Sequence, residues 1–110
     1  MRLAEGEFHA RLAACAGLAV VLFSSPHCGA CRAWKLRLPK ALANMAHAFY
    51  EVDVSEATGV ARYFGIFHLP TIYLYRDGQF HAELQCEAHP ERIQKAVKQL
   101  LLAPAQDEPD

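Results

Sequence analysis

Hydrophobic and polar residues along the chain follow two different patterns, and the segments with each pattern alternate. Apolar residues at helical spacing, or a helix-favouring composition, predict helices over Glu5–Ala16, Gly29–Ala46, Glu56–Phe64 and Pro90–Leu102. Apolar, β-branched and aromatic residues dominate four shorter segments and predict strands over Leu18–Phe23, Ala48–Val54, Thr71–Arg76 and Gln79–Gln85. The predicted order of elements is therefore α-β-α-β-α-β-β-α.

Several residues mark where these elements begin, bend or end. Gly17 suits the C′ position after the first helix, and Ser55 is a natural N-cap for the third. Pro90 suits the first turn of the last helix, whereas Pro39 lies inside the second one and predicts a kink there. The dipeptide Asp77-Gly78 between two strand patterns is a strong hairpin signal.

This order of elements predicts an α/β fold with one mixed sheet. Leu18–Phe23 is apolar throughout, as in a strand that is buried on both faces. A parallel strand–helix–strand unit followed by a hairpin gives a mixed sheet with helices on both faces. We expect a single domain over residues 1–103, followed by an acidic, disordered tail over residues 104–110 that contains two prolines.

The composition limits the classes of function. The chain has 110 residues, of which 53% are hydrophobic and 21% are charged, as expected of one soluble globular domain. Lys and Arg number 11 against 12 Asp and Glu, so the net charge of −1 leaves no basic footprint for nucleic acid or an anionic membrane. No apolar run approaches the roughly 20 residues of a membrane span. We therefore expect neither nucleic acid nor membrane as a partner.

The longest apolar stretch resembles the core of a signal peptide only superficially. It runs from Leu12 to Phe23, is broken by Gly17, and is preceded by the acidic residues Glu5 and Glu7 instead of a basic segment. No cleavage site with small residues follows it. We interpret the stretch as part of the fold and expect a cytoplasmic protein.

The four cysteines are unevenly placed along the chain. Cys28 and Cys31 form one C-x-x-C motif, while Cys15 and Cys86 stand alone. A zinc ribbon needs two such pairs, so we predict no metal site. In a reducing compartment, a single C-x-x-C motif is more often catalytic or metal-binding than a structural bridge.

The C-x-x-C motif falls where a predicted strand meets a predicted helix. The thiolate is the reactive form of cysteine, and the free N–H groups and dipole at a helix N-terminus favour that negative charge. His27 and Arg32 flank the motif and add positive charge. We therefore predict a lowered pKa for Cys28, and a more buried Cys31 that acts as the resolving thiol.

Three features of the sequence resemble the thioredoxin family. They are the strand–Cys28-Gly29-Ala30-Cys31–helix junction, the strand with Val52-Asp53 before a short helix ending in Phe64-Gly65-Ile66, and Leu69-Pro70-Thr71 opening a strand that turns at a glycine. The resemblance extends from about Phe8 to the last helix. It implies a thioredoxin-like fold whose central sheet has four strands, or five if a short strand fits into Met1–Glu7.

The resemblance also implies roles for residues outside the cysteine pair. In the family, the proline at the position of Pro70 follows a cis peptide bond and faces the disulfide, where the backbone of Leu69 can pair with an extended substrate. The same proline keeps a metal ion away from the cysteines. By this resemblance, the active-site support comprises His27, Gly29, Ala30, Arg32 and Pro70. The residues expected to bind substrate are His68, Leu69 and Cys86.

The sequence departs from the family pattern at several positions. Leu22 stands where many thioredoxins have a buried acid that helps to deprotonate the second cysteine. Glu51 is either a substitute for that acid or a carboxylate at a strand edge in contact with water. His27 replaces a tryptophan and either tunes Cys28 or is merely exposed. Ala30 replaces a proline, a change that often accompanies a more oxidising potential.

The remaining candidates are interpreted mainly as packing residues. Cys86 is either a third thiol that traps substrate, is glutathionylated or helps to hold a metal, or a small buried hydrophobe. Cys15 and Trp34 are predicted to pack in the core. Tyr73 and Tyr75 alternate along a strand and predict core or cross-strand packing.

The sequence thus predicts a thiol–disulfide oxidoreductase that reduces or exchanges disulfides in protein substrates. Cys28 attacks the substrate, and Cys31 resolves the mixed disulfide. No nucleotide signature is present, so we expect no cofactor, a separate reductase as electron donor, and a monomer. Two alternatives stay open. One is a non-catalytic binding module, favoured by the absent acid, and the other is a metal or iron–sulfur carrier, opposed by the expected cis proline.

Overall fold

The elements of the computed structural model follow the predicted order. The structure describes residues 2–66 and 68–109, so Met1 and Asp110, which belong to two of the predicted segments, lie outside the described residues. The helices are a short 3-10 turn η1 (Glu5–Glu7), α1 (Phe8–Ala14), α2 (Gly29–Ala41), α3 (Thr58–Tyr63) and α4 (Pro90–Leu102). The strands are β1 (Leu18–Ser24), β2 (Ala48–Asp53), β3 (Thr71–Arg76) and β4 (Gln79–Glu83).

The sheet is mixed, as the sequence predicts. Its strand order is β2-β1-β3-β4, with β1 parallel to β2 and the other two pairs antiparallel. Asp77 and Gly78 both have positive φ angles, of 51° and 84°, as the two-residue turn of a hairpin requires. Arg2 forms an isolated parallel bridge with Glu51, so the described residues contain four strands and only a trace of a fifth.

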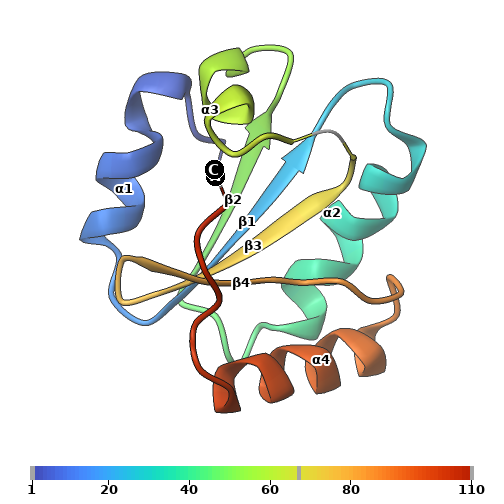
Figure 1. Cartoon of the computed structure of the whole chain (residues 1–110). Coiled ribbons are helices and arrows are strands. Elements are labelled where there is room, and N and C mark those ends of the chain that lie inside the picture. Colours follow the sequence, from blue (N-terminus) through green and yellow to red (C-terminus); the bar gives the residue numbers. More distant parts are fainter. Residues whose placement is uncertain (1, 67, 110) are drawn as a thin grey trace.

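Helices cover both faces of the sheet (Figure 1). Alternate residues of β1 point to opposite faces, which confirms that this strand is buried on both sides. Ala19, Val21 and Phe23 pack with α1 and α3. Leu18, Val20 and Leu22 pack with α2 and α4. Trp34, Tyr73 and Tyr75 are buried in these two cores, as predicted.

Two predicted helix boundaries are wrong for identifiable reasons. The second helix ends at Ala41 instead of Ala46. Pro39 has no N–H to donate to the carbonyl four residues earlier, which weakens this part of the helix. The chain then leaves the helix at Leu42, three residues after Pro39. The third helix begins at Thr58 without a side-chain cap. Ser55 is not its N-cap, because the Ser55 N–H and hydroxyl both donate to Oδ1 of Asp53, at 2.9 and 2.6 Å.

The first helix also differs from its predicted span, because it starts as the 3-10 turn η1 and α1 ends at Ala14. Gly17 lies beyond the helix end and has a φ angle of 75°. A side chain at this position would overlap the ring of His47. The glycine is therefore required by its backbone angle and by the close approach of the loop before β2.

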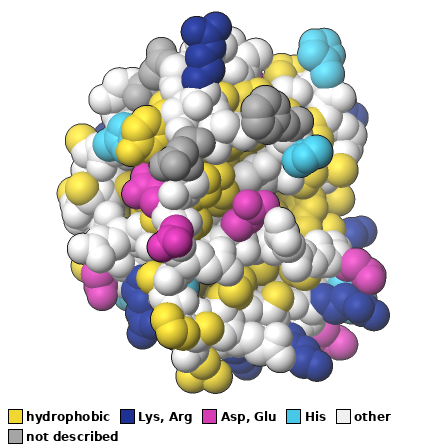
Figure 2. Space-filling view, viewed as in Figure 1, with side chains coloured by type: hydrophobic (Ala, Val, Ile, Leu, Met, Phe, Trp, Pro, Cys, Tyr) yellow, Lys and Arg dark blue, Asp and Glu magenta, His cyan; other side chains and the backbone are white. Residues whose placement is uncertain are grey.

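The segment after α4 forms neither a helix nor a strand among its described residues. It nevertheless contacts the edge of the sheet. The N–H of Gln106 donates to the carbonyl of His81 at 2.7 Å, and its side-chain oxygen accepts from the N–H of Glu83 at 3.1 Å. In Figure 1 this tail runs from α4 across the sheet, and Figure 2 shows Asp and Glu side chains over the middle of the same face. That the tail is disordered stays a prediction.

Within the described ranges, no helix has both the length and the apolar character that would let it cross a membrane.

Candidate functional site

The C-x-x-C motif lies at the junction of β1 and α2. Cys28 is the N-cap residue of α2, and Cys31 lies in its first turn. The two cysteines form a disulfide, with their Cα atoms 5.3 Å apart. Cys28 is half-buried, whereas Cys31 is only 1% exposed, so Cys31 is the more buried of the two, as the sequence analysis expects.

The helix N-terminus contacts the outer sulfur directly. The backbone N–H of Cys31 lies 3.2 Å from Sγ of Cys28 and donates to it. An N–H in this position stabilises negative charge on the sulfur once the disulfide is reduced, since the first N–H groups of a helix have no partner within it. The geometry favours Cys28 as the thiol that becomes a nucleophile.

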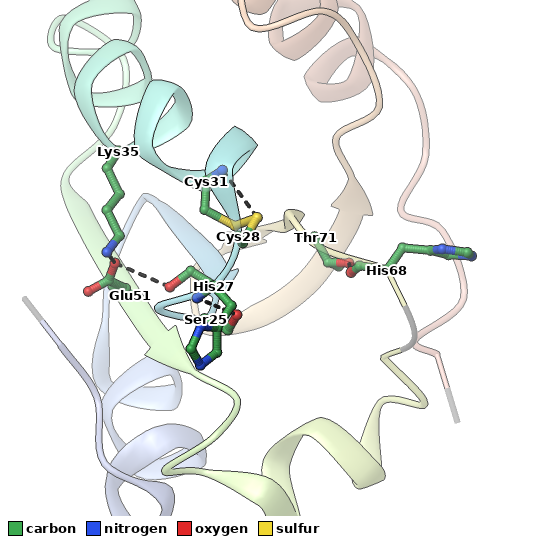
Figure 3. The surroundings of a disulfide bond; sticks show 9 residues. Ser25, His27, Cys28, Cys31, Lys35, Glu51, His68 and Thr71 are labelled. Atoms are coloured by element: carbon green, nitrogen blue, oxygen red, sulfur yellow. Dashed lines mark hydrogen bonds and ion pairs between the residues drawn. A yellow bond between two sulfur atoms is a disulfide. The ribbon is translucent and has the colours of Figure 1, made fainter.

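The loop before β3 lies on one side of the disulfide. The peptide bond between Leu69 and Pro70 is cis. In Figure 3, Thr71 and His68 lie on one side of the disulfide, while Lys35 and Glu51 lie on the other. The Thr71 hydroxyl donates to the carbonyl of His68 and so closes the loop.

Three of the predicted site residues line one cavity on this side: His68, Pro70 and Cys86, together with Trp34. Leu69 packs partly against the core beneath α1 and α3. His27 is exposed, and its N–H donates to the Ser25 hydroxyl oxygen at 3.3 Å. Gly29 and Ala30 are exposed in the first turn of α2.

The two free cysteines are both half-buried. Burial, and then the charge of Glu87, raise the pKa of the Cys86 thiol, which keeps it protonated at neutral pH. Because the thiolate is the reactive form, this environment disfavours a nucleophilic role for Cys86. Cys15 is less buried than predicted, and its Sγ lies 3.6 Å from the carbonyl of Ala16.

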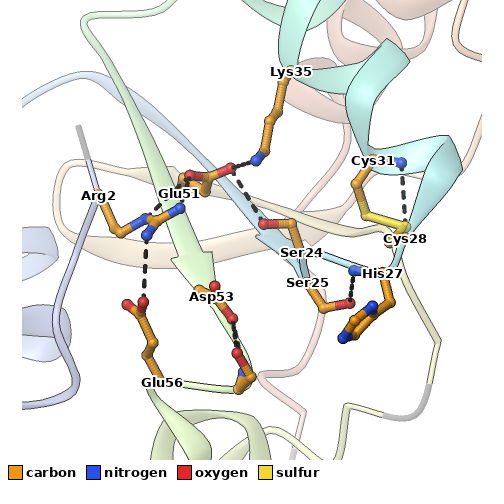
Figure 4. A network of polar contacts seen from close by, with 11 residues as sticks. Arg2, Ser24, Ser25, His27, Cys28, Cys31, Lys35, Glu51, Asp53 and Glu56 are labelled. Carbon is orange, nitrogen blue, oxygen red and sulfur yellow. Dashed lines mark hydrogen bonds and ion pairs between the residues drawn. A yellow bond between two sulfur atoms is a disulfide. The ribbon is translucent and has the colours of Figure 1, made fainter.

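A network of polar contacts lies on the other side of the disulfide (Figure 4). Its centre is Glu51, whose side chain is 21% exposed. Oε2 of Glu51 lies 2.6 Å from Nζ of Lys35 and accepts from the Ser24 hydroxyl at 3.2 Å. Oε1 of Glu51 lies 3.3 Å from Arg2. One carboxylate thus holds two cations and a buried hydroxyl.

This network bears on both predictions for Glu51. Burial raises the pKa of Glu51, but hydrogen bonds and opposite charges from Lys35 and Arg2 outweigh burial and lower it overall. Glu51 is therefore ionised at neutral pH and is a weak proton acceptor. It is thus not a close equivalent of the missing acid. It is a partly exposed carboxylate on an edge strand, as the second prediction has it, but it is also paired with protein groups.

The lowered pKa of Glu51 makes the stability of the protein depend on pH. We expect Glu51→Gln to reduce the free energy of unfolding at neutral pH by about 1 kcal/mol, because the carboxylate is paired in the folded state. This loss should shrink as the pH falls below the unfolded pKa of a glutamate and through the lower folded pKa. Urea unfolding of both proteins at neutral and acidic pH measures it. Asp107→Asn, at an exposed carboxylate after α4 and outside any helix, is the control, and an equal loss in Glu51→Gln at both pH values would contradict the expectation.

The sequence analysis missed three members of this network: Arg2, Ser24 and Lys35. Lys35 follows Cys31 by four residues, so helical spacing alone places both on one face of α2. Ser24 is a polar residue at the end of an apolar strand, which is a second available signal. For Arg2, the sequence offers only the possibility of a short strand within Met1–Glu7, with no indication that its side chain reaches Glu51.

The fold and the site together define a class of protein. A mixed sheet between two layers of helices carries a C-x-x-C disulfide at a helix N-terminus, and a loop with a cis proline leads into the neighbouring strand. This is the arrangement of thioredoxin-fold dithiol–disulfide proteins. The family model for thioredoxin matches residues 1–99, so the chain belongs to the thioredoxin family, and the resemblance noted from the sequence is confirmed.

Solved structures agree with this fold. The chain is similar to mitochondrial thioredoxin 3 from Saccharomyces cerevisiae in its oxidized form, with 24% identity, a TM-score of 0.74, and coverage of 90% of this chain and 93% of that one. A chain from a structural study of the thiol resolving mechanism in yeast mitochondrial 1-Cys peroxiredoxin via glutathione/thioredoxin systems matches at 24% identity and a TM-score of 0.71, with the same coverage. Human ERp44 in its zinc-bound form matches at 18% identity and a TM-score of 0.67, over 90% of this chain and 30% of that one. No curated protein sequence matches the chain.

Proposed function

We propose that this protein is a thiol–disulfide oxidoreductase that reduces or exchanges disulfides in protein substrates. The observation that carries the proposal is the Cys28–Cys31 disulfide at the N-terminus of α2, in a chain of the thioredoxin family. One sulfur belongs to a half-buried residue that accepts a backbone N–H, and the other belongs to a buried residue. This asymmetry suits a nucleophile and a resolving thiol.

The reaction begins from the reduced dithiol. The Cys28 thiolate attacks a substrate disulfide, forms a new S–S bond with one substrate sulfur and releases the other as a thiolate. The Cys31 thiolate then attacks the sulfur of Cys28, and the second substrate thiolate leaves. Two electrons pass to the substrate, and the protein returns to the disulfide form seen in the structure.

The next turnover requires an external electron donor. Thioredoxins generally act on protein disulfides with a reductase as partner, and we propose the same two kinds of partner for this chain. We also propose that it works as a monomer in the cytoplasm, where reduced thiols persist. Its substrate contacts are expected in the cavity beside Pro70, where His68 and Cys86 also lie.

A disulfide-reduction assay tests the proposed function. Reduction of a protein disulfide by dithiothreitol should be accelerated by the protein, and Cys28→Ser should lower that acceleration at least a hundredfold. Cys15→Ser is the matched control, because Cys15 packs with the α1 side of the core, away from the C-x-x-C motif. Equal activity of the Cys28→Ser and control variants would contradict the proposal.

The reduction potential then decides the direction of electron flow. Trp34 is buried one turn beyond Cys31, so its fluorescence should report the redox state during equilibration in glutathione buffers. A value near roughly −270 mV supports a reductase, and a value above roughly −200 mV supports an oxidant or isomerase. The absence of any two-electron transition would leave only a binding role for the fold.

A further inference from the structure

A cavity of about 300 Å³ lies beside the disulfide on the side away from the loop of Pro70. Both cysteines line it, and so does the buried Ser24. Its charged lining consists of three cations and one carboxylate: Arg2, Arg32, Lys35 and Asp53. The carboxylate is already occupied, because Oδ1 of Asp53 accepts both the N–H and the hydroxyl of Ser55. Three of the four charged side chains that line the cavity are therefore cations, of which Lys35 is paired with Glu51 and Arg2 with both Glu51 and Glu56.

Glu51 does not line this cavity but holds two of its cations in place. Its Oε1 contacts Arg2, and its Oε2 contacts Lys35. The side chains of these two cations are 51% and 41% exposed, and long exposed side chains sample many rotamers unless a partner fixes them. The short contact of 2.6 Å to Lys35 fixes its ammonium at the rim of the cavity. Lys35 also shares a helix face with Cys31, four residues earlier.

The buried sulfur of Cys31 forms a thiolate readily only if a nearby group stabilises the negative charge. Cys31 is 1% exposed, and burial in apolar surroundings disfavours a thiolate. The strand beneath it offers Leu22 in place of an acid. The carboxylates of Glu51 and Asp53 both have lowered pKa values, so neither is a good proton acceptor at neutral pH.

The charged and titratable groups around the disulfide come from several elements. They are Arg32 and Lys35 on α2, Cys28 at its N-cap, Arg2 on the N-terminal segment, Glu51 and Asp53 on β2, Glu56 after β2 in an ion pair with Arg2, His27 before α2, and His68 on the loop before β3. Of the cations, Lys35 has the shortest ion pair and lies on the same helix face as Cys31. Because Lys35 also lines the same cavity as Cys31, one turn further along that helix face, it is the candidate for stabilising a negative sulfur there.

We propose that the Lys35 ammonium, positioned by Glu51, stabilises the thiolate of Cys31 during the resolving step and takes the place of a general base. The Cys31 proton leaves to solvent, and no carboxylate receives it. The thiolate then forms the S–S bond with Cys28, and the bond between Cys28 and the substrate sulfur breaks with release of a substrate thiolate. This inference rests on the proposed function.

The two chemical steps can be observed separately with dithionitrobenzoate, an aryl disulfide that releases a coloured thiolate. Attack by the Cys28 thiolate releases the first coloured thiolate at a rate that depends on reagent concentration. Attack by Cys31 on the mixed disulfide releases the second at a rate that does not. The full chain should carry Cys15→Ser and Cys86→Ser, so that only the two site thiols react. The rate of each phase is recorded against pH.

Lys35→Met should move the midpoint of the second phase to higher pH by about one pH unit, since removal of a nearby opposite charge disfavours the thiolate. At neutral pH, the thiolate fraction then falls about tenfold, but a more basic thiolate is intrinsically about threefold more nucleophilic. The second phase should therefore be about threefold slower at neutral pH and about threefold faster on the high-pH plateau. Structural damage alone would not make the two profiles cross.

Two matched variants complete the experiment. Lys35→Arg keeps the positive charge, so its second phase should have the same pH profile as the protein with Lys35. Lys40→Met removes a lysine in the last turn of the same helix, outside the cavity, and should leave both phases unchanged. An unshifted second phase in Lys35→Met and in Lys35→Gln would overturn the inference while a normal first phase leaves the proposed function standing. Absence of a second coloured thiolate in every variant would overturn both.

Discussion

Replacement of Cys31 by serine should convert a transient intermediate into a stable covalent complex. Cys28 keeps its position at the N-terminus of α2 and still attacks a substrate disulfide. Serine is nearly isosteric with cysteine, so the buried site should remain packed, but its hydroxyl does not displace a thiolate from sulfur. The mixed disulfide then has no intramolecular route to resolution. We expect most of the Cys31→Ser protein to carry a substrate, against only a small fraction of the unmodified protein.

Intact mass measurement after a short exposure to a protein disulfide, followed by acid quenching, detects this complex. Peptide mapping without reductant should place the substrate on Cys28. The double variant Cys28→Ser with Cys31→Ser is the control and should form no adduct at this site. An adduct located on Cys15 or Cys86 instead would show that Cys28 is not the attacking thiol.

Truncation of Phe23 should cause a large loss of stability. The side chain is 0% exposed near the C-terminal end of β1. Its ring centroid lies 5.9, 6.0 and 5.1 Å from the ring centroids of Phe8, Phe64 and Tyr73. Phe23 thus joins α1, the end of α3 and β3 in one aromatic cluster. We expect Phe23→Ala to lower the free energy of unfolding by about 3–5 kcal/mol, through lost burial and a cavity in the core.

Urea unfolding followed by circular dichroism measures the loss. Domains of this size have total stabilities of about 5–15 kcal/mol, so the variant should be close to unfolding at elevated temperature. Leu36→Ala is the control, because the Leu36 side chain is 68% exposed on α2, and it should change stability by less than about 0.5 kcal/mol. A change of similar size in both variants would mean that the aromatic cluster does not support the core.

The order of elements could be predicted because the strongest signals are local. The apolar run of β1 and the turn residues between β3 and β4 specify their structure without help from distant residues. Helix boundaries are harder to predict, because the hydrogen-bond partners of the end groups depend on which residues are nearest in space. Ser55 has the chemistry of an N-cap, yet its hydroxyl donates to Asp53 two residues earlier. The helix after it begins without any side-chain cap.

In the candidate site too, some features could be predicted from the sequence and others could not. The C-x-x-C motif and the loop of Pro70 are visible in the sequence, because their spacing carries the information. The network around Glu51 depends on four segments that meet only after folding: the N-terminal segment, β1, α2 and β2. Register places Glu51 opposite Leu22 on the parallel strand, and Lys35 reaches it from the helix above. Sequence reasoning therefore identified Glu51 as a candidate but could not assign its ionisation state.

Each edge strand of the sheet, β2 and β4, is contacted on its outer side by a short segment from one end of the sequence. Leu3 donates its N–H to the Glu51 carbonyl at 2.8 Å along the outer side of β2, and Gln106 contacts the outer side of β4. Short segments from opposite ends of the sequence thus occupy backbone groups that are open to intermolecular strand pairing. Shortened versions of the chain would expose these groups and invite aggregation. Affinity tags are consequently better separated from residues 2–3 and 106 by flexible spacers than fused directly beside them.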